Sequence, residues 1–236
     1  EYWKMVMQIA RNSTLQRIIR CSQIMGRAEK DVLSAAQILY PCMQAADIFY
    51  LKADICQLGM DQRKVNVLAR ELGEKLGYYK PVIVSHHMLM GLKEPPKEEG
   101  DSVERAIAMK MSKSDPDSAI FISDSEEDVK RKISKAYCPE KKVEENPILE
   151  YCKYIIFERF KQIKIERSVK YGSNLALKSY TQLEETYSAG KLHPSDLKNA
   201  VAFYLNELIR PIREHFEKNK KAKELYETVN KFKVTR

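Results

Sequence analysis

The 236-residue sequence lacks any apolar run long enough to span a bilayer, and its first residues are not a basic leader followed by an apolar stretch. It also lacks paired cysteine motifs: its five cysteines fall at irregular spacing, with no CxxC and no histidine beside them at metal-ligand spacing. These absences argue against a membrane segment, a signal peptide and a structural zinc. We therefore expect a cytoplasmic protein with reduced thiols and no protein-bound metal.

What the chain does have is enough apolar residues for a core, and an excess of positive charge. Hydrophobic residues make up 44% and charged residues 31%, which is typical of folded rather than disordered chains. The length allows one large domain or two ordinary ones. The net charge of +8 favours a polyanionic partner, although many basic proteins bind no nucleic acid.

Short apolar runs alternate with helical patterns in the first part of the chain. We predict a helix over about 41–52, with Pro41 in its first turn, and a buried strand at 55–58. A second helix, capped by Asp61, is predicted to follow, and then a second strand at 81–84. Strand–helix units of this kind indicate an α/β sheet.

From about residue 137 the strand signals become few and long amphipathic patterns take over. Pro211 is predicted to end or kink one of the helices there. We place a second, mainly helical domain over residues 137–236, after a first domain over residues 1–136. The predicted helices of the second domain cover 150–160, 181–188, 196–209 and 221–231.

One predicted helix carries an unusual polar face. Tyr40, Gln44 and Asp47 are spaced i, i+4 and i+7, so they lie above one another on the same side of the helix. Taken alone, this pattern is more often a stripe that faces water. The alternative is a set of hydrogen-bonding groups that converge on a small polar ligand. A glycine at the end of the following strand, Gly59, would let such a ligand approach the backbone.

A second motif is the five-residue stretch KMSKS, from Lys110 to Ser114, which follows a polar, proline-led connection. It is either a solvated basic loop or a loop that holds a triphosphate. The lysines of such a loop would stabilise charge that builds up on pyrophosphate. The motif alone does not decide between the two.

Taken in order, Tyr-x-x-x-Gln-x-x-Asp, Gly-x-Asp-Gln and KMSKS resemble the class I tyrosyl-tRNA synthetases of the archaeal–eukaryotic cytosolic type, over nearly the whole chain. The resemblance implies an α/β fold: the second half of a Rossmann-type catalytic domain over 1–136, then a mainly α-helical anticodon-binding domain over 137–236. It also implies ATP-dependent activation of tyrosine to tyrosyl-adenylate, and transfer of the tyrosine to tRNA(Tyr).

The resemblance implies roles for the tyrosine-site residues. Tyr40 and Gln44 match positions that hold the α-amino group of tyrosine. Asp47 matches the acceptor for the phenol, Gln62 matches a further tyrosine-binding position, and Asp61 matches a contact to the adenylate ribose.

The resemblance also implies an ATP site. Lys110 and Lys113 would act catalytically on the pyrophosphate, and ATP would arrive with Mg²⁺. Met88 would border the adenine and pair with Met111 around it; the alternative is that Met88 only fills the core. The loop residues expected to contact ATP are Lys110, Met111, Ser112, Lys113 and Ser114.

In the second domain, Tyr171 and the run His193, Pro194, Asp196 resemble the anticodon-reading elements of the family. There an aromatic ring stacks on a base and a carboxylate accepts hydrogen bonds from it, which is how single-stranded RNA is usually read. For Asp196, an equally weighted alternative is a helix N-cap.

The sequence departs from the family in one respect: it contains no His-x-Gly-His motif or close variant. We therefore expect it to hold the rear half of an active site and to be a poor catalyst by itself. A homodimer, or a pseudo-dimer with a second synthetase unit, is the expected assembly. Two other possibilities remain: a tryptophanyl-tRNA synthetase, and a non-catalytic tRNA-binding or regulatory fragment.

Overall fold

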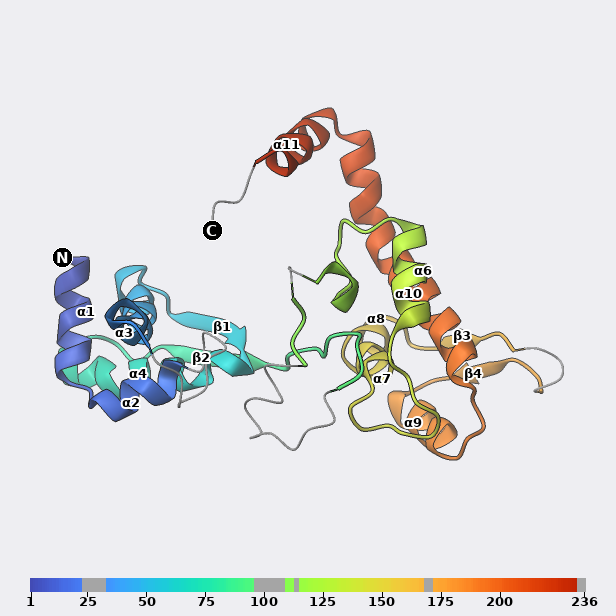
Figure 1. Ribbon diagram of the computed structural model, residues 1–236, viewed down its shortest axis with the longest axis horizontal. Helices are drawn as coiled ribbons and strands as arrows, with labels where there is room; N and C mark the ends of the chain where they lie inside the picture. Colours follow the sequence, from blue (N-terminus) through green and yellow to red (C-terminus); the bar gives the residue numbers. More distant parts are fainter. Residues whose placement is uncertain (23–32, 96–108, 113–114, 168–171, 233–236) are drawn as a thin grey trace. The chain divides into compact units, whose positions relative to one another are not determined.

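The computed structural model describes residues 1–22, 33–95, 109–112, 115–167 and 172–232 (Figure 1). By contact, the chain divides into two compact units: Glu1–Met88 with Lys97–Ala108, and Leu89–Pro96 with Met109–Arg236. The segment around Lys110 belongs to the second unit. It is joined to residues 89–95 of that unit by an antiparallel bridge between Met90 and Lys110. The predicted division at 136/137 is a division by function, and it stays a prediction.

In the described part of the first unit, four helices share one core with one face of a short parallel sheet (Figure 1). Its core contains side chains from α1, α2, α3, β1 and α4. The elements are α1 (Tyr2–Arg11), α2 (Leu15–Cys21), α3 (Ala35–Tyr50), β1 (Ile55–Gly59), the 3-10 turn η2 (Met60–Gln62), α4 (Arg63–Gly73), the 3-10 turn η3 (Glu74–Leu76) and β2 (Val82–His86).

Helix α3 begins earlier than its proline suggested. Ser34 caps the helix: its hydroxyl accepts from the Gln37 N–H, and the Gln37 side chain accepts from the Ser34 N–H. This capping box satisfies two of the donors that a helix start leaves unpaired. Pro41 consequently lies inside the helix, buried, and its predicted place in the first turn is wrong.

The predicted strands at 55–58 and 81–84 are present as β1 and β2, joined by α4 as expected for a strand–helix unit. They pair in parallel, with Ile55 beside Val82 and Gly59 beside His86. Asp61 is not the cap of the helix between them, because it lies within η2. The 3-10 turn bridges the strand end and α4, so that the α-helix proper starts at Arg63.

The two faces of this sheet differ. Cys56 and Ile83 face the core of the first unit. Ile55, Val82 and Val84 lie on the other face and are 66%, 53% and 45% exposed. Parallel sheets are usually covered on both faces. Among the described residues, this sheet is covered on one face only, and its other face is open.

The described part of the second unit is mainly helical, with one short antiparallel strand pair. Its elements are the 3-10 turn η4 (Pro116–Ser118), α6 (Glu126–Lys135), α7 (Pro147–Tyr151), the π-helical turn η5 (Cys152–Ile156), α8 (Phe157–Arg159), β3 (Ile163–Ile165), β4 (Leu175–Leu177), α9 (Tyr180–Ser188), α10 (Pro194–Lys218) and α11 (Lys220–Asn230).

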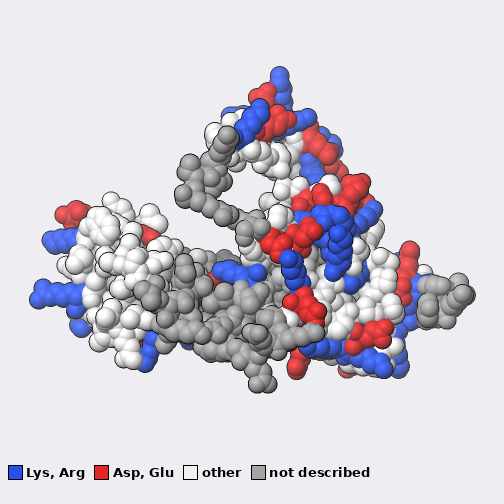
Figure 2. All heavy atoms as spheres, in the orientation of Figure 1, with Lys and Arg blue, Asp and Glu red and all other residues white. Residues whose placement is uncertain are grey.

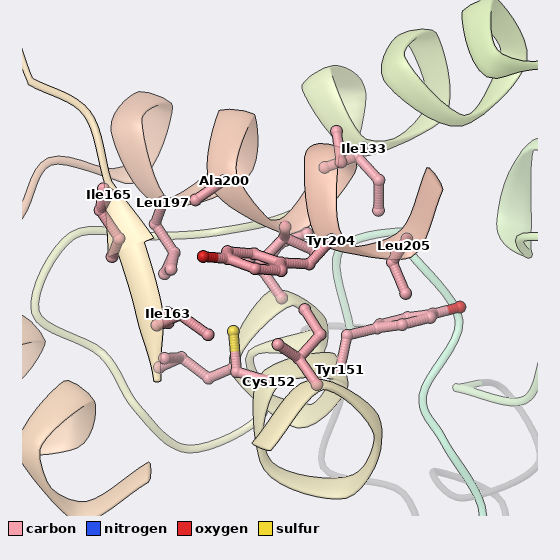
Figure 3. Packing of buried hydrophobic residues seen from close by; sticks show 14 of the residues in the cluster. Ile133, Tyr151, Cys152, Ile163, Ile165, Leu197, Ala200, Tyr204 and Leu205 are labelled. Atoms are coloured by element: carbon pink, nitrogen blue, oxygen red, sulfur yellow. The ribbon is translucent and has the colours of Figure 1, made fainter. Parts of the chain in front are cut away.

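Figure 3 shows how α10 organises the core of the second unit. Its buried side chains meet those of α6, of α7 with η5, and of β3. The Tyr204 hydroxyl also accepts a hydrogen bond from the Lys164 N–H (2.7 Å), which ties β3 to α10. The labelled members of the cluster are Ile133, Tyr151, Cys152, Ile163, Ile165, Leu197, Ala200, Tyr204 and Leu205.

Helix α10 differs from the prediction at both ends. It continues through Pro211 to Lys218, so of the two predicted effects of Pro211 an end of the helix is wrong, and a kink stays a prediction. Proline removes one main-chain hydrogen bond, and burial of the α10 face that precedes it can offset that loss. At the start, the cap is His193, whose Nδ1 accepts from the Ser195 N–H (3.1 Å). The N-cap role considered for Asp196 is therefore wrong; Asp196 lies in the first turn.

Candidate functional site

The polar face predicted on α3 lines a cleft of about 440 Å³ in the first unit. Tyr40, Gln44 and Asp47 line one side, and residues of β1, including Gln57 and Leu58, line the other. The helical spacing brings the three α3 side chains together because residues four and seven apart lie on one face. The cleft therefore combines a phenol, an amide and a carboxylate with an apolar strand surface.

Gln44 is connected to the strand end by a hydrogen bond. Its Nε2 donates to Oε1 of Gln62 (2.9 Å), in η2 directly after β1. Two of the predicted site residues, 18 positions apart, are thus held together. The Gln44 Oε1 atom remains an acceptor suited to an ammonium group.

Gly59 allows close approach where β1 ends. A Cβ atom at this position would overlap Met88 Sδ and lie 2.6 Å from Asp61 Oδ1. A larger residue at this position would make the Met88 and Asp61 side chains shift, so Gly59 lets both of them lie close to the strand end. The three residues form one corner of the first unit, and it includes two positions predicted to contact ATP.

Asp47 is held by a residue that the sequence did not point to. The Tyr2 hydroxyl donates to Asp47 Oδ1 (2.6 Å) and has a longer contact, 3.2 Å, with the Met43 carbonyl oxygen. Burial, then the hydrogen bond to Asp47 and its negative charge, raise the pKa of Tyr2 to about 12. The hydroxyl consequently stays protonated, and remains a donor, at neutral pH.

The described part of the KMSKS stretch is held through its backbone in the second unit. The Gly91 N–H donates to the Met109 carbonyl (2.7 Å), next to the bridge between Met90 and Lys110. The Ser112 N–H donates to the Ser118 hydroxyl (3.0 Å). The Lys110 side chain is exposed. Lys113 and Ser114 lie outside the described residues.

Met88 and Met111 belong to different units. Met111 packs, partly buried, against the core of the second unit. Their predicted pairing around an adenine stays a prediction.

A second cleft, of about 580 Å³, lies in the second unit where α10 begins. It is lined by His193 and Asp196, two of the predicted anticodon residues, together with Glu140, Lys191 and Arg167. Pro194, also predicted, occupies the first position of α10. Tyr171 lies outside the described residues.

Arg167 shapes this second cleft. Its side chain donates to the carbonyl oxygens of Ser173 (Nε, 2.8 Å) and Lys191 (Nη1, 3.0 Å). It thereby joins the chain before β4 to the turn after α9. The lining of the cleft is mixed in charge: it contains Arg167 and Lys191 together with the carboxylates of Glu140 and Asp196.

Sequence reasoning missed Tyr2, Gln57 and Arg167. Gln57 could have been found from its position near the carboxyl end of a predicted strand, where parallel sheets place their ligands. Tyr2 and Arg167 carried no local signal. They reach their sites through packing between segments that are distant in sequence.

Three further observations bear on the class of protein. Among the described residues, no group of three or more His, Cys, Asp or Glu side chains could hold a metal ion. No described helix is both long and apolar enough to cross a membrane. All five cysteines are free thiols, and burial raises the pKa of Cys42 to about 11.

Comparison with known proteins places the chain among the tRNA synthetases. Residues 1–210 match the family of class I tRNA synthetases for tryptophan and tyrosine (W and Y). The chain is 56% identical to the protein named tyrosine–tRNA ligase 2, cytoplasmic, and 53% identical to tyrosine–tRNA ligase 1, cytoplasmic, both of Arabidopsis thaliana. All of the chain aligns with each, but it spans only 30% and 58% of their lengths.

Solved structures of tRNA synthetases are also similar to this chain. Tyrosyl-tRNA synthetase of Pyrococcus horikoshii, determined with L-tyrosine, is 44% identical and superposes with a TM-score of 0.85; the match covers 96% of this chain and 65% of that one. Tryptophanyl-tRNA synthetase of Aeropyrum pernix is 18% identical, with a TM-score of 0.61 over 94% of this chain and 56% of that one, so it shares the fold alone. Because the family match covers most of its residues, the chain belongs to the class I tRNA synthetases of the tryptophan and tyrosine type.

Proposed function

We propose that this chain supplies the tyrosine-binding cleft and part of the ATP-binding site of a tyrosine–tRNA ligase. The observation that carries the proposal is the convergence of Tyr40, Gln44 and Asp47 on one cleft, with Gln62 bonded to Gln44. The relatives of 53% and 56% identity are named as tyrosine–tRNA ligases, and one similar structure was determined with L-tyrosine.

The cleft suits tyrosine at both of its ends. Tyr40 and Gln44 offer oxygen acceptors for the α-amino group, and Asp47 offers a carboxylate for the phenol. Phenylalanine would leave that carboxylate desolvated and without its donor, which costs binding energy. Tyrosyl-tRNA synthetases are themselves a well-known example of this discrimination between tyrosine and phenylalanine.

The ATP half of the proposal rests on the KMSKS stretch. Attack of the tyrosine carboxylate on the α-phosphate breaks the bond to pyrophosphate and needs no protein nucleophile. Lys110 and Lys113 would stabilise the charge that develops on the leaving pyrophosphate, and Met111, Ser112 and Ser114 would complete the loop. Mg²⁺ would enter as part of the ATP substrate. Asp61 would contact the ribose and Met88 the adenine.

The second cleft is proposed to read the anticodon of tRNA(Tyr). Asp196 would accept hydrogen bonds from a base edge, and His193, next to Pro194, and Tyr171 would stack on the base. Lys191, in the same cleft, would neutralise a phosphate. Lys198, also near the start of α10, is not part of this cleft. It lines a different groove, between α6 and α10, and donates to the Ser134 carbonyl (3.0 Å).

Assembly and location belong to the same proposal. The protein that carries this chain is proposed to be cytoplasmic, like the two plant relatives by their names. It is proposed to act as a homodimer or a pseudo-dimer with a second synthetase unit. Because the sequence contains no His-x-Gly-His motif, we expect slow tyrosine activation by these 236 residues alone.

Replacing Asp47 tests the tyrosine assignment. In the protein that carries this chain, Asp47→Ala should lower kcat/KM for tyrosine by about a hundredfold, since a hydrogen bond to a charged group is lost. With phenylalanine the change should be only a few-fold. The measurement is amino-acid-dependent ATP–pyrophosphate exchange, and Glu74→Ala, an exposed carboxylate of the same unit, is the control. Unchanged preference for tyrosine would reject the assignment.

The two other possible functions give different results. A tryptophanyl-tRNA synthetase would activate tryptophan in preference to tyrosine. The 18% identity of the tryptophanyl structure gives that alternative less support than the tyrosyl relatives give ours. A non-catalytic RNA-binding protein would show no exchange with any amino acid.

Asp196→Ala tests the RNA assignment separately. The variant should raise KM for tRNA(Tyr) in aminoacylation by about tenfold, the lower end of what a base contact contributes. Tyrosine-dependent ATP–pyrophosphate exchange, which needs no tRNA, should stay unchanged. Glu224→Ala, a substitution on α11 away from the cleft, controls for the loss of one negative charge. Equal KM values for Asp196→Ala and wild type would contradict this role.

A further inference from the structure

The contact between Tyr2 and Asp47 joins two helices at the candidate phenol-binding end of the cleft. Tyr2 lies in the first turn of α1, and Asp47 lies near the end of α3. Their oxygen atoms are 2.6 Å apart, a short distance that is typical of a hydroxyl donating to a carboxylate. The two residues are 45 positions apart in sequence, so tertiary packing alone brings them together.

Tyr2 is itself well positioned. Its ring meets the ring of Tyr50 edge-on, with centroids 5.2 Å apart and planes at 76°. It also packs against the core of the first unit. The Tyr2 ring is therefore fixed by neighbours on α3, and its hydroxyl can in turn fix the exposed Asp47 side chain.

The hydrogen bond occupies one of the two carboxylate oxygens. Tyr2 donates to Oδ1, and a carboxylate accepts through both of its oxygens. An exposed Asp side chain otherwise rotates among several rotamers, and ordering it costs conformational entropy when a ligand binds. A partner within the protein that orders Asp47 beforehand removes part of that cost.

We propose that Tyr2 is a positioning residue that orients the Asp47 carboxylate, so that Oδ2 receives the phenol of the bound amino acid. Tyr2 would thereby contribute to the choice of tyrosine over phenylalanine without touching the reacting atoms. The inference deepens the proposed function and rests on it.

Tyr2→Phe is the direct test, because it removes one oxygen atom and keeps the ring contacts. In the protein that carries this chain, we expect the Kd for L-tyrosine to rise about tenfold and the Kd for L-phenylalanine to change less than twofold. Both are measured by calorimetry. A merely structural role would weaken both ligands alike, so the ratio of the two constants is the deciding number.

Tyr78→Phe is the matched control. It also removes a phenol oxygen from the first unit, where the Tyr78 hydroxyl donates to Gln8 Oε1 (3.2 Å). We expect it to leave both Kd values unchanged. A thermal melt of each variant checks that the fold is retained.

A double variant tests whether Tyr2 acts through Asp47. In an Asp47→Ala background, Tyr2→Phe should change the Kd for tyrosine by less than twofold. A full tenfold effect in that background would overturn the proposal, as would tighter tyrosine binding by Tyr2→Phe, which would mean that Tyr2 competes with the ligand. If Asp47→Ala weakens tyrosine binding but Tyr2→Phe does not, the inference fails and the proposed function stands. No tyrosine binding by the wild type would overturn both.

Discussion

At the scale of single residues, the buried cation Lys132 carries the clearest energetic consequence. Its Nζ donates to both carboxylate oxygens of Asp124 (2.9 and 2.7 Å) and to the Ala119 carbonyl (3.1 Å). It also lies 4.6 Å from the centroid of the Phe121 ring. The side chains of Lys132 and Asp124 are only 3% and 11% exposed. Lys132 thus anchors the segment after the KMSKS stretch to α6.

We predict that Lys132→Ala lowers the free energy of unfolding by about 3 kcal/mol, because it leaves a buried carboxylate without its cation. Urea denaturation measures the change. Lys130→Ala is the matched control: Lys130 lies on the same helix and forms an exposed ion pair with Glu126 (2.6 Å), and an exposed pair of this kind contributes much less than a buried one. Equal losses for the two variants would show that burial of the Lys132 pair has no energetic effect.

The sequence predicted neighbours best where they lie on one element. The spacing of Tyr40, Gln44 and Asp47 puts them on one helix face, and all three line one cleft; their contacts with tyrosine stay a prediction. Tyr2 and Arg167 were missed because their partners come from other elements. No periodicity in a sequence shows that α1 packs on α3 in a register that puts a hydroxyl on Asp47.

At the scale of elements, helix starts depend on capping side chains, and one of these caps is buried. Asn146 begins α7, where its Oδ1 accepts from the N–H groups of Ile148 (3.1 Å) and Leu149 (3.4 Å). Its Nδ2 donates to the Lys142 carbonyl (3.0 Å). The side chain is fully buried, so water cannot replace these bonds.

Asn146→Ala should therefore destabilise the protein by about 2–3 kcal/mol, more than an ordinary cap, because buried N–H groups lose their acceptor. Asn219→Ala provides the comparison. Asn219 caps α11 through one bond to the Ala222 N–H (3.0 Å) in an exposed position, and its loss should cost about 1 kcal/mol. Thermal or urea unfolding of both variants gives the difference. A smaller loss for Asn146→Ala than for Asn219→Ala would contradict this explanation.

Proline was the weakest guide to element boundaries. Pro41 lies inside α3 because the Ser34 capping box fixes an earlier start. Pro211 lies inside α10, which continues to Lys218 although its buried residues end at Ile209. The signal that would have served better is Asn146 followed by Pro147, an N-cap with proline at the first helical position. The three-residue strands β3 and β4 are too short for an alternating pattern to stand out.

At the scale of the whole molecule, the sequence did not show where the contacts divide. The segment 89–95 pairs with residues around Met109 and Lys110, and also bonds to the second unit through the Glu150 carboxylate, which accepts from the Met90 N–H (2.8 Å). Such pairing across a long connection has no local pattern. The class of fold, in contrast, followed from the order of strand and helix signals and from the three motifs together.

Charge is distributed over the second unit as many opposite pairs rather than as one basic field. Figure 2 shows Lys and Arg interspersed with Asp and Glu over the surfaces of α6, α10 and α11. Hydrogen bonds from basic side chains or from Ser125 lower the pKa of four carboxyl groups. These are Asp117, through Arg131; Glu126, through Lys130; Asp128, through Ser125 and then Arg131; and Glu214, through Lys218.

These lowered pKa values predict that the second unit loses stability in acid. A carboxyl group whose pKa is lower in the folded state adds stability above its unfolded pKa, near 4, and that stability is lost as the pH falls through the folded pKa. The midpoint of urea unfolding, followed by circular dichroism, should therefore decrease between about pH 5 and pH 3.

The triple variant Asp117→Asn, Glu126→Gln, Asp128→Asn should show a smaller decrease than wild type. A control triple, Glu158→Gln, Glu184→Gln, Glu217→Gln, removes the same charge elsewhere in the unit and should retain the wild-type decrease. If the two triple variants respond to acid alike, the pairs around α6 are not the source of the pH dependence.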